Sequence, residues 1–174
     1  MLAWIDLETT GLDPQTEQVL EIACIITNDQ FEEVARFERV ICSARSFDSL
    51  SSVVQDMHAK SGLWTAVKAE GAISESVADA ELAWFLHEHA PYAQLAGSTI
   101  SFDREFMRHH LPAALQQLHY RNLDVSTLNE TARRFWPDVY ATRPNSAEKA
   151  HRAMADIEES LAVARHYTQK LRAA

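Results

Sequence analysis

The sequence predicts an α/β domain in which helices flank a mixed sheet of about five strands. Three observations support this fold class. The first part of the chain contains apolar or alternating runs separated by turn residues, as in antiparallel strands. From residue 74 onward, helical patterns alternate with short apolar strands, an order typical of helices packed on a sheet. With 174 residues, of which 47% are hydrophobic, the chain fits one domain or at most two small ones, and we expect one, residues 1–174.

The first expected strand covers residues 2–7 and leads into a turn at Gly11 and Pro14. Two carboxylates, Asp6 and Glu8, stand two positions apart, so both point to the same face of the sheet. Like charges on a half-buried strand are unfavourable unless a cation lies between them. The pair indicates a site for a hard divalent cation such as Mg²⁺ or Mn²⁺. The alternative is an edge strand with a solvated acidic face, but the flanking apolar residues favour the metal site.

Two further strands are expected over residues 19–27 and 31–42. The first of these runs is rich in β-branched residues, and the second alternates apolar and charged residues over part of its length. A turn around Asn28 and Asp29 would join them into an antiparallel hairpin beside the first strand. Glu21, inside the first run, is expected to face solvent.

The two cysteines, Cys24 and Cys42, lie in apolar runs without the spacing of a metal site. We therefore expect reduced thiols in the core and a cytoplasmic location. The start of the chain lacks the features of a signal peptide. No run of about 18 apolar residues predicts a membrane span.

The middle of the chain holds a weak helical pattern followed by a clear one. In residues 43–71, one of Ser49, Ser51 or Ser52 is expected to cap a short helix over residues 53–58.

A longer helix is expected to begin at Ser74 and to end before Pro91. Its expected apolar side consists of Val77, Leu82, Trp84, Phe85 and Leu86. A short strand is expected within residues 92–100, and the next helix is expected to begin at Asp103. Because aspartate is a preferred N-cap, a capping role for Asp103 stands beside a role as a metal ligand.

The last third of the chain is expected to hold a strand ending at Asp124 and a helix that runs through Phe135, capped by Ser126 or Thr127. Residues 137–149 contain two prolines and many polar residues, as a loop does.

The final helix is expected to start near Ala153, which places Asp156 in its first turns and His151 on the segment before it. An ordinary amphipathic helix would explain the apolar pattern but not the histidine and the aspartate together. Histidine titrates near neutral pH, so His151 is a candidate proton acceptor.

The formal net charge of −9 at pH 7 argues against an extended nucleic-acid duplex as partner, because proteins that grip such duplexes carry a basic face. A phosphodiester substrate remains compatible if metal ions supply the positive charge, or if the substrate is only a few nucleotides long. Acidic proteins are also simply common and soluble.

Three strings resemble the motifs of the DEDD superfamily of 3′-to-5′ exonucleases. They are residues 5–11 (IDLETTG), residues 97–106 (GSTISFDREF) and residues 151–161 (HRAMADIEESL). The resemblance implies a ribonuclease-H-like fold in which four carboxylates hold two divalent metal ions, Mg²⁺ or Mn²⁺, and a histidine acts as general base. By motif position, the four carboxylates are Asp6, Glu8, Asp103 and Asp156, and the histidine is His151.

Two further strings are similar to oligoribonucleases in particular. Residues 58–63 (HAKSGL) match an HxxSGL segment, and residues 119–128 (HYRNLDVSTL) match an HYRxLDVSTL segment. This resemblance implies a homodimer that degrades very short single-stranded RNA, especially dinucleotides, to nucleoside 5′-monophosphates.

The residues that the resemblance places against the substrate are Leu12, His58, Thr99, Tyr120, Arg121 and Ser126. Leu12 would wedge between two bases. Thr99 and Ser126 would hold the 5′-phosphate, and the partner subunit would contribute Tyr120 and Arg121.

Three positions depart from the oligoribonuclease pattern: Thr9 replaces methionine, Thr99 replaces serine, and Val53 falls where a base-stacking tryptophan is common. They leave open a general single-strand 3′-to-5′ exonuclease acting on DNA or RNA. A non-catalytic nucleotide-binding module on the same fold is the alternative from another class. Such a module predicts the loss of a metal-site acid, and all four acids are present.

Overall fold

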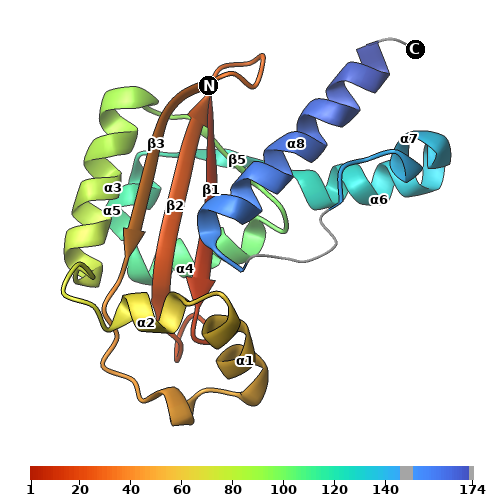
Figure 1. Ribbon diagram of the computed structural model, residues 1–174. Coiled ribbons are helices and arrows are strands. Elements are labelled where there is room, and N and C mark those ends of the chain that lie inside the picture. The colour runs from red at the N-terminus through yellow and green to blue at the C-terminus, as the bar shows by residue number, and fades with distance from the viewer. Residues whose placement is uncertain (146–150, 173–174) are drawn as a thin grey trace.

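The computed structural model of the protein describes residues 1–145 and 151–172. Its centre is a sheet of five strands in the order β3-β2-β1-β4-β5 (Figure 1). The strands are β1 (Leu2–Thr9), β2 (Val19–Thr27), β3 (Glu33–Val40), β4 (Gln94–Gly97) and β5 (His119–Asp124). β1, β2 and β3 pair antiparallel, whereas β4 runs parallel to both β1 and β5. The predicted mixed five-stranded α/β fold is confirmed.

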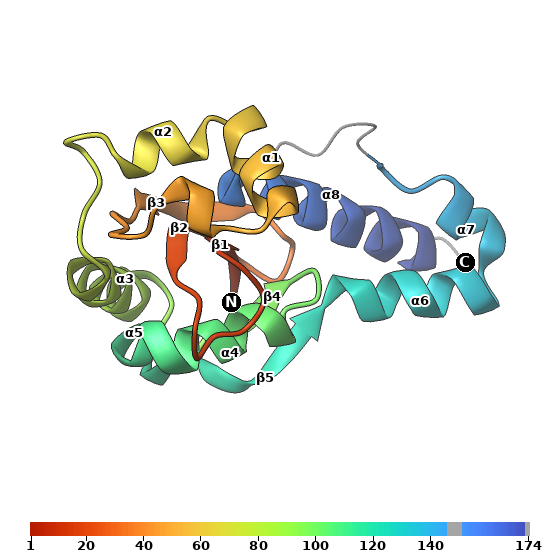
Figure 2. The same ribbon diagram turned by 90° about the horizontal axis from the view of Figure 1, so that it is seen from below.

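Eight α-helices and one short 3-10 turn accompany the strands in the described part of the chain. They are η1 (Phe47–Ser49), α1 (Ser52–Lys60), α2 (Leu63–Val67), α3 (Glu75–His89), α4 (Ser101–His110), α5 (Pro112–Gln116), α6 (Val125–Phe135), α7 (Pro137–Ala141) and α8 (Ala153–Arg172). Helices α3, α4 and α5 cover one face of the sheet and α8 covers the other (Figures 1 and 2). Helices α6 and α7 extend beyond the sheet beside α8. No helix among the described residues is long and apolar enough to cross a membrane.

The two faces of β1 pack into different cores because side chains alternate along a strand. Ala3 and Ile5 belong to the core beneath α3, α4 and α5, while Leu2 and Trp4 belong to the core beneath α8. The even-numbered positions of β1 therefore face α8. This alternation directs the carboxylates of Asp6 and Glu8 toward the same helix.

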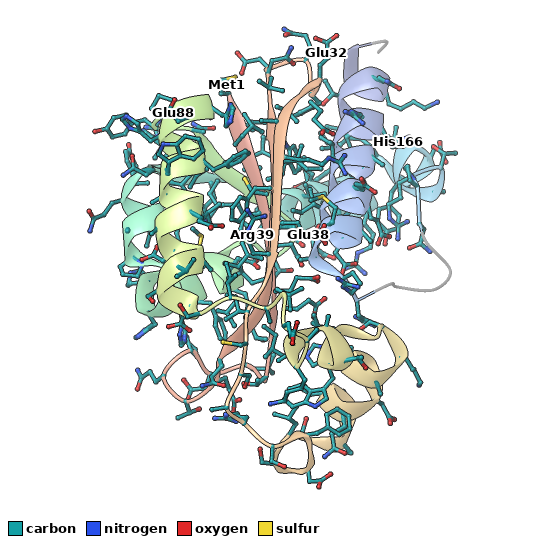
Figure 3. The ribbon with its side chains drawn as sticks, turned by 60° about the vertical axis from the view of Figure 1, so that its left-hand side comes forward. Met1, Glu32, Glu38, Arg39, Glu88 and His166 are labelled. Atoms are coloured by element: carbon teal, nitrogen blue, oxygen red, sulfur yellow. The ribbon has the colours of Figure 1, made fainter. Side chains whose placement is uncertain are left out.

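Figure 3 views the sheet nearly edge-on, with side chains filling the layer on each side. On β3, Arg39 projects toward α3, where its Nε lies 2.7 Å from Glu81 Oε2. Glu38 projects to the opposite side, toward α8. Its Oε1 lies 4.0 Å from Arg152 Nη2, just before that helix begins.

Several element boundaries agree with the sequence. β2 spans the predicted residues 19–27. Ser51 and Ser74 cap α1 and α3, each accepting a hydrogen bond from the backbone N–H three residues later. α3 ends at His89, before Pro91, and α8 starts at the predicted Ala153.

Three predictions about exposure were wrong. Glu21 does not face solvent: it is fully buried, for a reason described below. Cys24 is buried as predicted, but Cys42 is exposed, because it follows the end of β3, where the alternation of the strand stops. On α3, Trp84 and Val77 are 65% and 44% exposed, so the buried stripe of this helix is narrower than its apolar composition indicates.

Helix starts in the second half also differ from the prediction. α4 begins at Ser101, so Asp103 lies in its first turn and does not cap it. The side chain of Asp124 caps α6 by accepting a hydrogen bond from the Ser126 N–H at 2.8 Å; neither Ser126 nor Thr127 is the cap. The predicted loop over residues 137–149 contains α7, and its residues 146–149 lie outside the described part of the chain.

Candidate active site

One cleft of about 480 Å³ collects all four acids that the sequence singled out. Asp6 and Glu8 come from β1, Asp103 from the first turn of α4, and Asp156 from the first turn of α8. Residues separated by 150 positions in the chain thus line one site. Asp6 and Glu8 do not lie on a solvated edge strand, because β1 is the central strand of the sheet.

Asp103 is the most buried of the four acids, and its side chain is hydrogen-bonded to the backbone of β1. It is 4% exposed, and its Oδ1 accepts a hydrogen bond from the Leu7 N–H at 3.0 Å. Burial raises the pKa of this carboxyl, and the backbone hydrogen bond from Leu7 opposes the shift. The contact fixes α4 against β1 between Asp6 and Glu8.

Glu8 lies where several negative charges meet. It is 7% exposed, and burial, followed by the charges of Asp6 and Asp156, raises its pKa from 4.5 to about 8. A carboxylate with so high a pKa is an unfavourable anion in the metal-free protein. A bound divalent cation would reverse this effect, because it stabilises the deprotonated form.

His151 stands next to this group. Ligand atoms of Glu8, His151 and Asp156 all lie within 4.8 Å of one another. His151 has a backbone φ of 47°, in the left-handed region that non-glycine residues seldom adopt. Crowded carboxylate oxygens are ligands that suit divalent metal ions, and the His151 imidazole lies beside two of these carboxylates.

Three of the predicted substrate residues also line the cleft: Leu12, Thr99 and Ser126. Leu12 is 84% exposed at the tip of the loop after β1. The hydroxyls of Thr99 and Ser126 lie 3.0 Å apart, and Ser126 Oγ also accepts the Thr99 N–H at 2.9 Å. Thr99, with a φ of 55°, lies in the turn between β4 and α4, and Ser126 lies in the first turn of α6. Two elements thus present neighbouring hydroxyl groups at the cleft.

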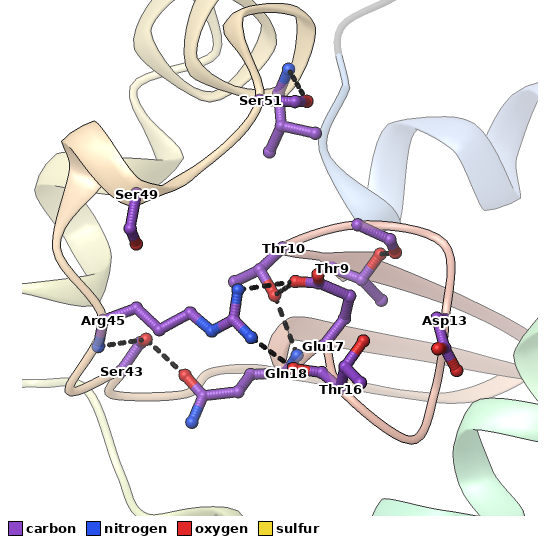
Figure 4. A network of polar contacts seen from close by, with 12 residues as sticks. Thr9, Thr10, Asp13, Thr16, Glu17, Gln18, Ser43, Arg45, Ser49 and Ser51 are labelled. Carbon is purple, nitrogen blue, oxygen red and sulfur yellow. Dashed lines mark hydrogen bonds and ion pairs between the residues drawn. The ribbon is translucent and has the colours of Figure 1, made fainter.

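A polar network fixes the loop that carries Leu12 (Figure 4). Glu17 Oε2 accepts hydrogen bonds from Thr10 Oγ1 at 2.5 Å and from Arg45 Nη1 at 2.9 Å. Gly11 lies so close to Glu17 that an added Cβ would meet Glu17 Cδ at 2.8 Å. The loop is therefore closely packed although Leu12 itself is exposed.

The structure does not bring the other three substrate residues into the cleft. His58 is fully buried and donates from Nε2 to the Thr9 carbonyl oxygen at 2.9 Å. Tyr120 is 73% exposed on the edge strand β5, and the Arg121 guanidinium carbon lies 5.4 Å from the centre of its ring. The contacts predicted for His58, Tyr120 and Arg121 with the substrate stay predictions.

Other residues at the cleft were missed by the sequence interpretation. Among the described residues that line it, Arg143 has the one cationic side chain. Its guanidinium carbon lies 3.8 Å from the Tyr140 ring centre. The polar loop of residues 137–149 gave no sign of this arrangement. Further lining residues that the sequence did not single out are Ser98, Asn129, Asn145, Glu159 and Ser160.

Comparison with known proteins agrees with this geometry. The exonuclease family matches residues 3–164 of the chain. The fold and the acidic cleft thus define a nuclease of the exonuclease class. Exonuclease I from E. coli, bound to single-stranded DNA and zinc, has a TM-score of 0.75 with 17% identity; the match covers 97% of this chain and 40% of that one. Exonuclease I from Methylocaldum szegediense gives a TM-score of 0.73 with 21% identity and the same coverage. At these identities the two structures establish the fold alone.

Curated relatives narrow the class. The oligoribonuclease of Aromatoleum aromaticum is 40% identical over 95% of this chain and 91% of its own length. That of Bordetella pertussis is 39% identical over 98% and 94%, and the mitochondrial oligoribonuclease of Mus musculus is 36% identical over 98% and 73%. The chain belongs to the oligoribonuclease family.

Proposed function

We propose that this protein hydrolyses short single-stranded RNA from the 3′ end and releases nucleoside 5′-monophosphates. The observation that carries the proposal is the gathering of four carboxylates in a single cleft, with a histidine beside Glu8 and Asp156, on a chain of the oligoribonuclease family.

The cofactors that we propose are two divalent ions, Mg²⁺ or Mn²⁺. Asp6, Glu8, Asp103 and Asp156 would hold them through their carboxylate oxygens. When bound, such a pair supplies positive charge to the attacking and leaving oxygens of a displacement at phosphorus.

His151 is the proposed general base of the reaction. It would take a proton from the water that attacks the phosphorus, while the bond between phosphorus and the 3′-oxygen breaks. The 3′-oxygen departs with the shortened RNA and gains a proton, and the phosphate stays on the released nucleotide. The raised pKa of Glu8 means that this carboxyl must lose its proton before it can serve as a ligand.

The proposed substrate is short because the cleft offers little cationic surface. The net charge is −9, and Arg143 is the cation among the described lining residues. Leu12 would separate two bases, and the Thr99 and Ser126 hydroxyls would hold a terminal 5′-phosphate. Together these contacts would engage both bases and the terminal 5′-phosphate of a dinucleotide.

We further propose a homodimer in which Tyr120 and Arg121 serve the site of the neighbouring subunit. Both side chains are exposed on the edge strand β5, outside the cleft of their own subunit, so a second copy can meet them. A cytoplasmic location is proposed because Cys24 and Cys42 are free thiols, as suits a reducing compartment.

A second candidate is a general single-strand exonuclease acting on DNA or RNA. The fold shared with exonuclease I bound to single-stranded DNA favours it, as does Thr9 in place of methionine. The acidic net charge argues against it.

A length series separates the two candidates. RNA and DNA oligomers of two to about ten nucleotides, labelled at the 5′ end, are digested under limiting enzyme with added Mg²⁺ or Mn²⁺. Preference for the RNA dinucleotide supports the proposed function, and equal rates on long DNA support the second candidate. Asp156→Ala should be inactive, and Glu88→Ala, a change of an exposed acid on α3, should retain full activity. Activity in Asp156→Ala would refute both candidates.

A further inference from the structure

A further carboxylate, that of Glu21, lies beside the cleft without lining it. Glu21 is fully buried and stands directly opposite Glu8 in the β1–β2 ladder. A buried carboxylate next to other acids is unfavourable unless it is paired. The partners of Glu21 must therefore explain why a glutamate is buried in β2.

Both oxygens of Glu21 are engaged by the segment that precedes and opens α8. Arg152 donates from Nε to Oε1 at 2.9 Å and from Nη2 to Oε1 at 2.5 Å. The backbone N–H of Ala153 donates to Oε2 at 2.9 Å. We call Glu21, the Arg152 guanidinium and the Ala153 N–H the Glu21 clasp. Both oxygens of Glu21 thus have hydrogen-bond donors, and Glu21 is not among the residues that line the cleft.

The Ala153 N–H is the first of α8, where helices leave their amides without intrahelical partners. Glu21 thus caps this helix from a neighbouring strand, and its negative charge also suits the positive end of the helix dipole. Asp156 lies one turn further along the same helix. The clasp therefore ties the N-terminus of α8 to the strand beside β1.

The clasp also constrains His151, the residue immediately before Arg152. A left-handed conformation, here φ 47°, persists in a non-glycine residue only where its surroundings hold it. Two nitrogens of the Arg152 guanidinium form charge-assisted hydrogen bonds with the buried Glu21 carboxylate. The same carboxylate accepts the hydrogen bond of the Ala153 N–H. The backbone on the C-terminal side of His151 thus has little freedom.

We propose that Glu21 is a positioning residue, which acts through Arg152 and the Ala153 N–H to hold the His151 imidazole beside Glu8 and Asp156. The inference rests on the proposed function in taking His151 as the proton acceptor. Glu21 itself touches neither substrate nor metal. Its part is to keep the imidazole at a fixed place before the substrate arrives, as general-base catalysis requires.

Glu21→Gln tests this role because it keeps the size of the side chain and removes the charge. We expect kcat to fall by about 10- to 100-fold, since a displacement of about 1 Å can reduce a rate by 10², while KM for a dinucleotide stays within about twofold. The matched control is Glu33→Gln on β3. It makes the same chemical change and breaks the Arg36 pair, in which Nε and Nη2 each lie 2.8 Å from a Glu33 oxygen. This control should keep the wild-type kcat and KM.

A double-mutant cycle separates positioning from a general disturbance. If Glu21 acts through His151, Glu21→Gln should reduce kcat by less than about twofold in a His151→Ala background, because residues that act as a unit are not additive. A full 10- to 100-fold loss in that background would overturn the proposal. So would a lowered unfolding temperature with unchanged kcat, which indicates a purely structural role.

A second measurement does not depend on activity. In the metal-free protein, the NMR signal of the His151 imidazole Cε1–H, assigned by its absence in His151→Ala, should be single and sharp. It should be broadened or split in Glu21→Gln and unchanged in Glu33→Gln. An unchanged signal in Glu21→Gln would refute the positioning role even if the protein proved to have no ribonuclease activity.

Arg152→Lys provides the same tests if Glu21→Gln does not fold. Lysine keeps the charge but donates from one nitrogen, so kcat should fall by a smaller factor, about three- to tenfold, with the same lack of additivity with His151→Ala. Wild-type kcat and a wild-type imidazole signal in Arg152→Lys would show that the guanidinium contacts do not position His151.

Discussion

Replacing Glu8 with glutamine should stabilise the metal-free protein, and increasingly so as the pH rises. The folded protein raises the pKa of Glu8 from 4.5 to about 8, first through burial and then through Asp6 and Asp156. Between those two pH values the folded state binds a proton that the unfolded chain has released. The stability of the wild-type protein therefore falls as the pH rises from about 4.5 to about 8, and the loss is complete above about 8.

The size of the effect follows from the shift. One pKa unit corresponds to about 1.4 kcal/mol, so a shift from 4.5 to about 8 amounts to roughly 5 kcal/mol. Water entering the cleft and movement of the neighbouring acids reduce this value, and we expect about half of it. For a protein of this size, 1 kcal/mol changes the unfolding temperature by about 2–4 °C. Glu8→Gln should thus raise the unfolding temperature by about 5–10 °C near pH 8.5.

Thermal unfolding followed by circular dichroism in the presence of a chelator measures the difference at several pH values. The gap between Glu8→Gln and wild type should be small near pH 5 and largest above pH 8. Added Mg²⁺ should stabilise the wild type and have little effect on Glu8→Gln, which lacks a ligand. Glu33→Gln is the control of opposite sign, since Arg36 lowers the pKa of Glu33. A Glu8→Gln protein that is less stable than wild type at pH 8.5 would refute the electrostatic reasoning.

Further outcomes test the separate parts of the site. Asp156→Ala should abolish hydrolysis with the fold intact, which circular dichroism and a dinucleotide assay establish; residual activity would contradict its role as a ligand. His151→Ala should lower kcat by about 10²–10⁴-fold and flatten the neutral limb of the pH–rate profile. An unchanged pH–rate profile would mean that another group is the general base. Heterodimers that carry Arg121→Ala in one subunit and Asp156→Ala in the other should recover about half of the wild-type activity per dimer, because Arg121 is proposed to act across the interface. If heterodimers form without any recovery of activity, Arg121 does not serve the neighbouring subunit. Arg143→Gln should raise KM for RNA severalfold and leave kcat nearly unchanged; a selective fall in kcat would assign it to the chemical step.

The placement of Asp6, Glu8 and Asp156 on their elements could be predicted from the sequence because the signals are local, whereas Asp103 was singled out only by its resemblance to an exonuclease motif. The period of two along β1 places Asp6 and Glu8 on one face, and the start of α8 near Ala153 places Asp156 in its first turn. Each inference needs only the geometry of one element. The antiparallel hairpin of β2 and β3 beside β1 followed from similar patterns.

Contacts between distant parts of the chain could not be predicted in this way. Glu21 was expected in solvent because nothing near it in the sequence shows a partner, whereas Arg152 lies 131 positions away. Arg143 reaches the cleft from a loop whose polar composition matches any surface segment. The proposed roles of Tyr120 and Arg121 depend on a second subunit, so one chain cannot establish them.

The order of the elements along the chain also governs when the protein acquires its site during synthesis. β1, β2 and β3 lie within the first 40 residues and are joined by the loop of residues 10–18 and the turn of residues 28–32, so their pairings are local and should form early. Asp156 belongs to the last helix, and the contact between Glu21 and Arg152 spans 131 positions. A growing polypeptide on the ribosome therefore holds Asp6 and Glu8 long before it holds Asp156. With Asp156 as a ligand, as proposed, we expect the nascent enzyme to be inactive toward nearby RNA until α8 has emerged and docked.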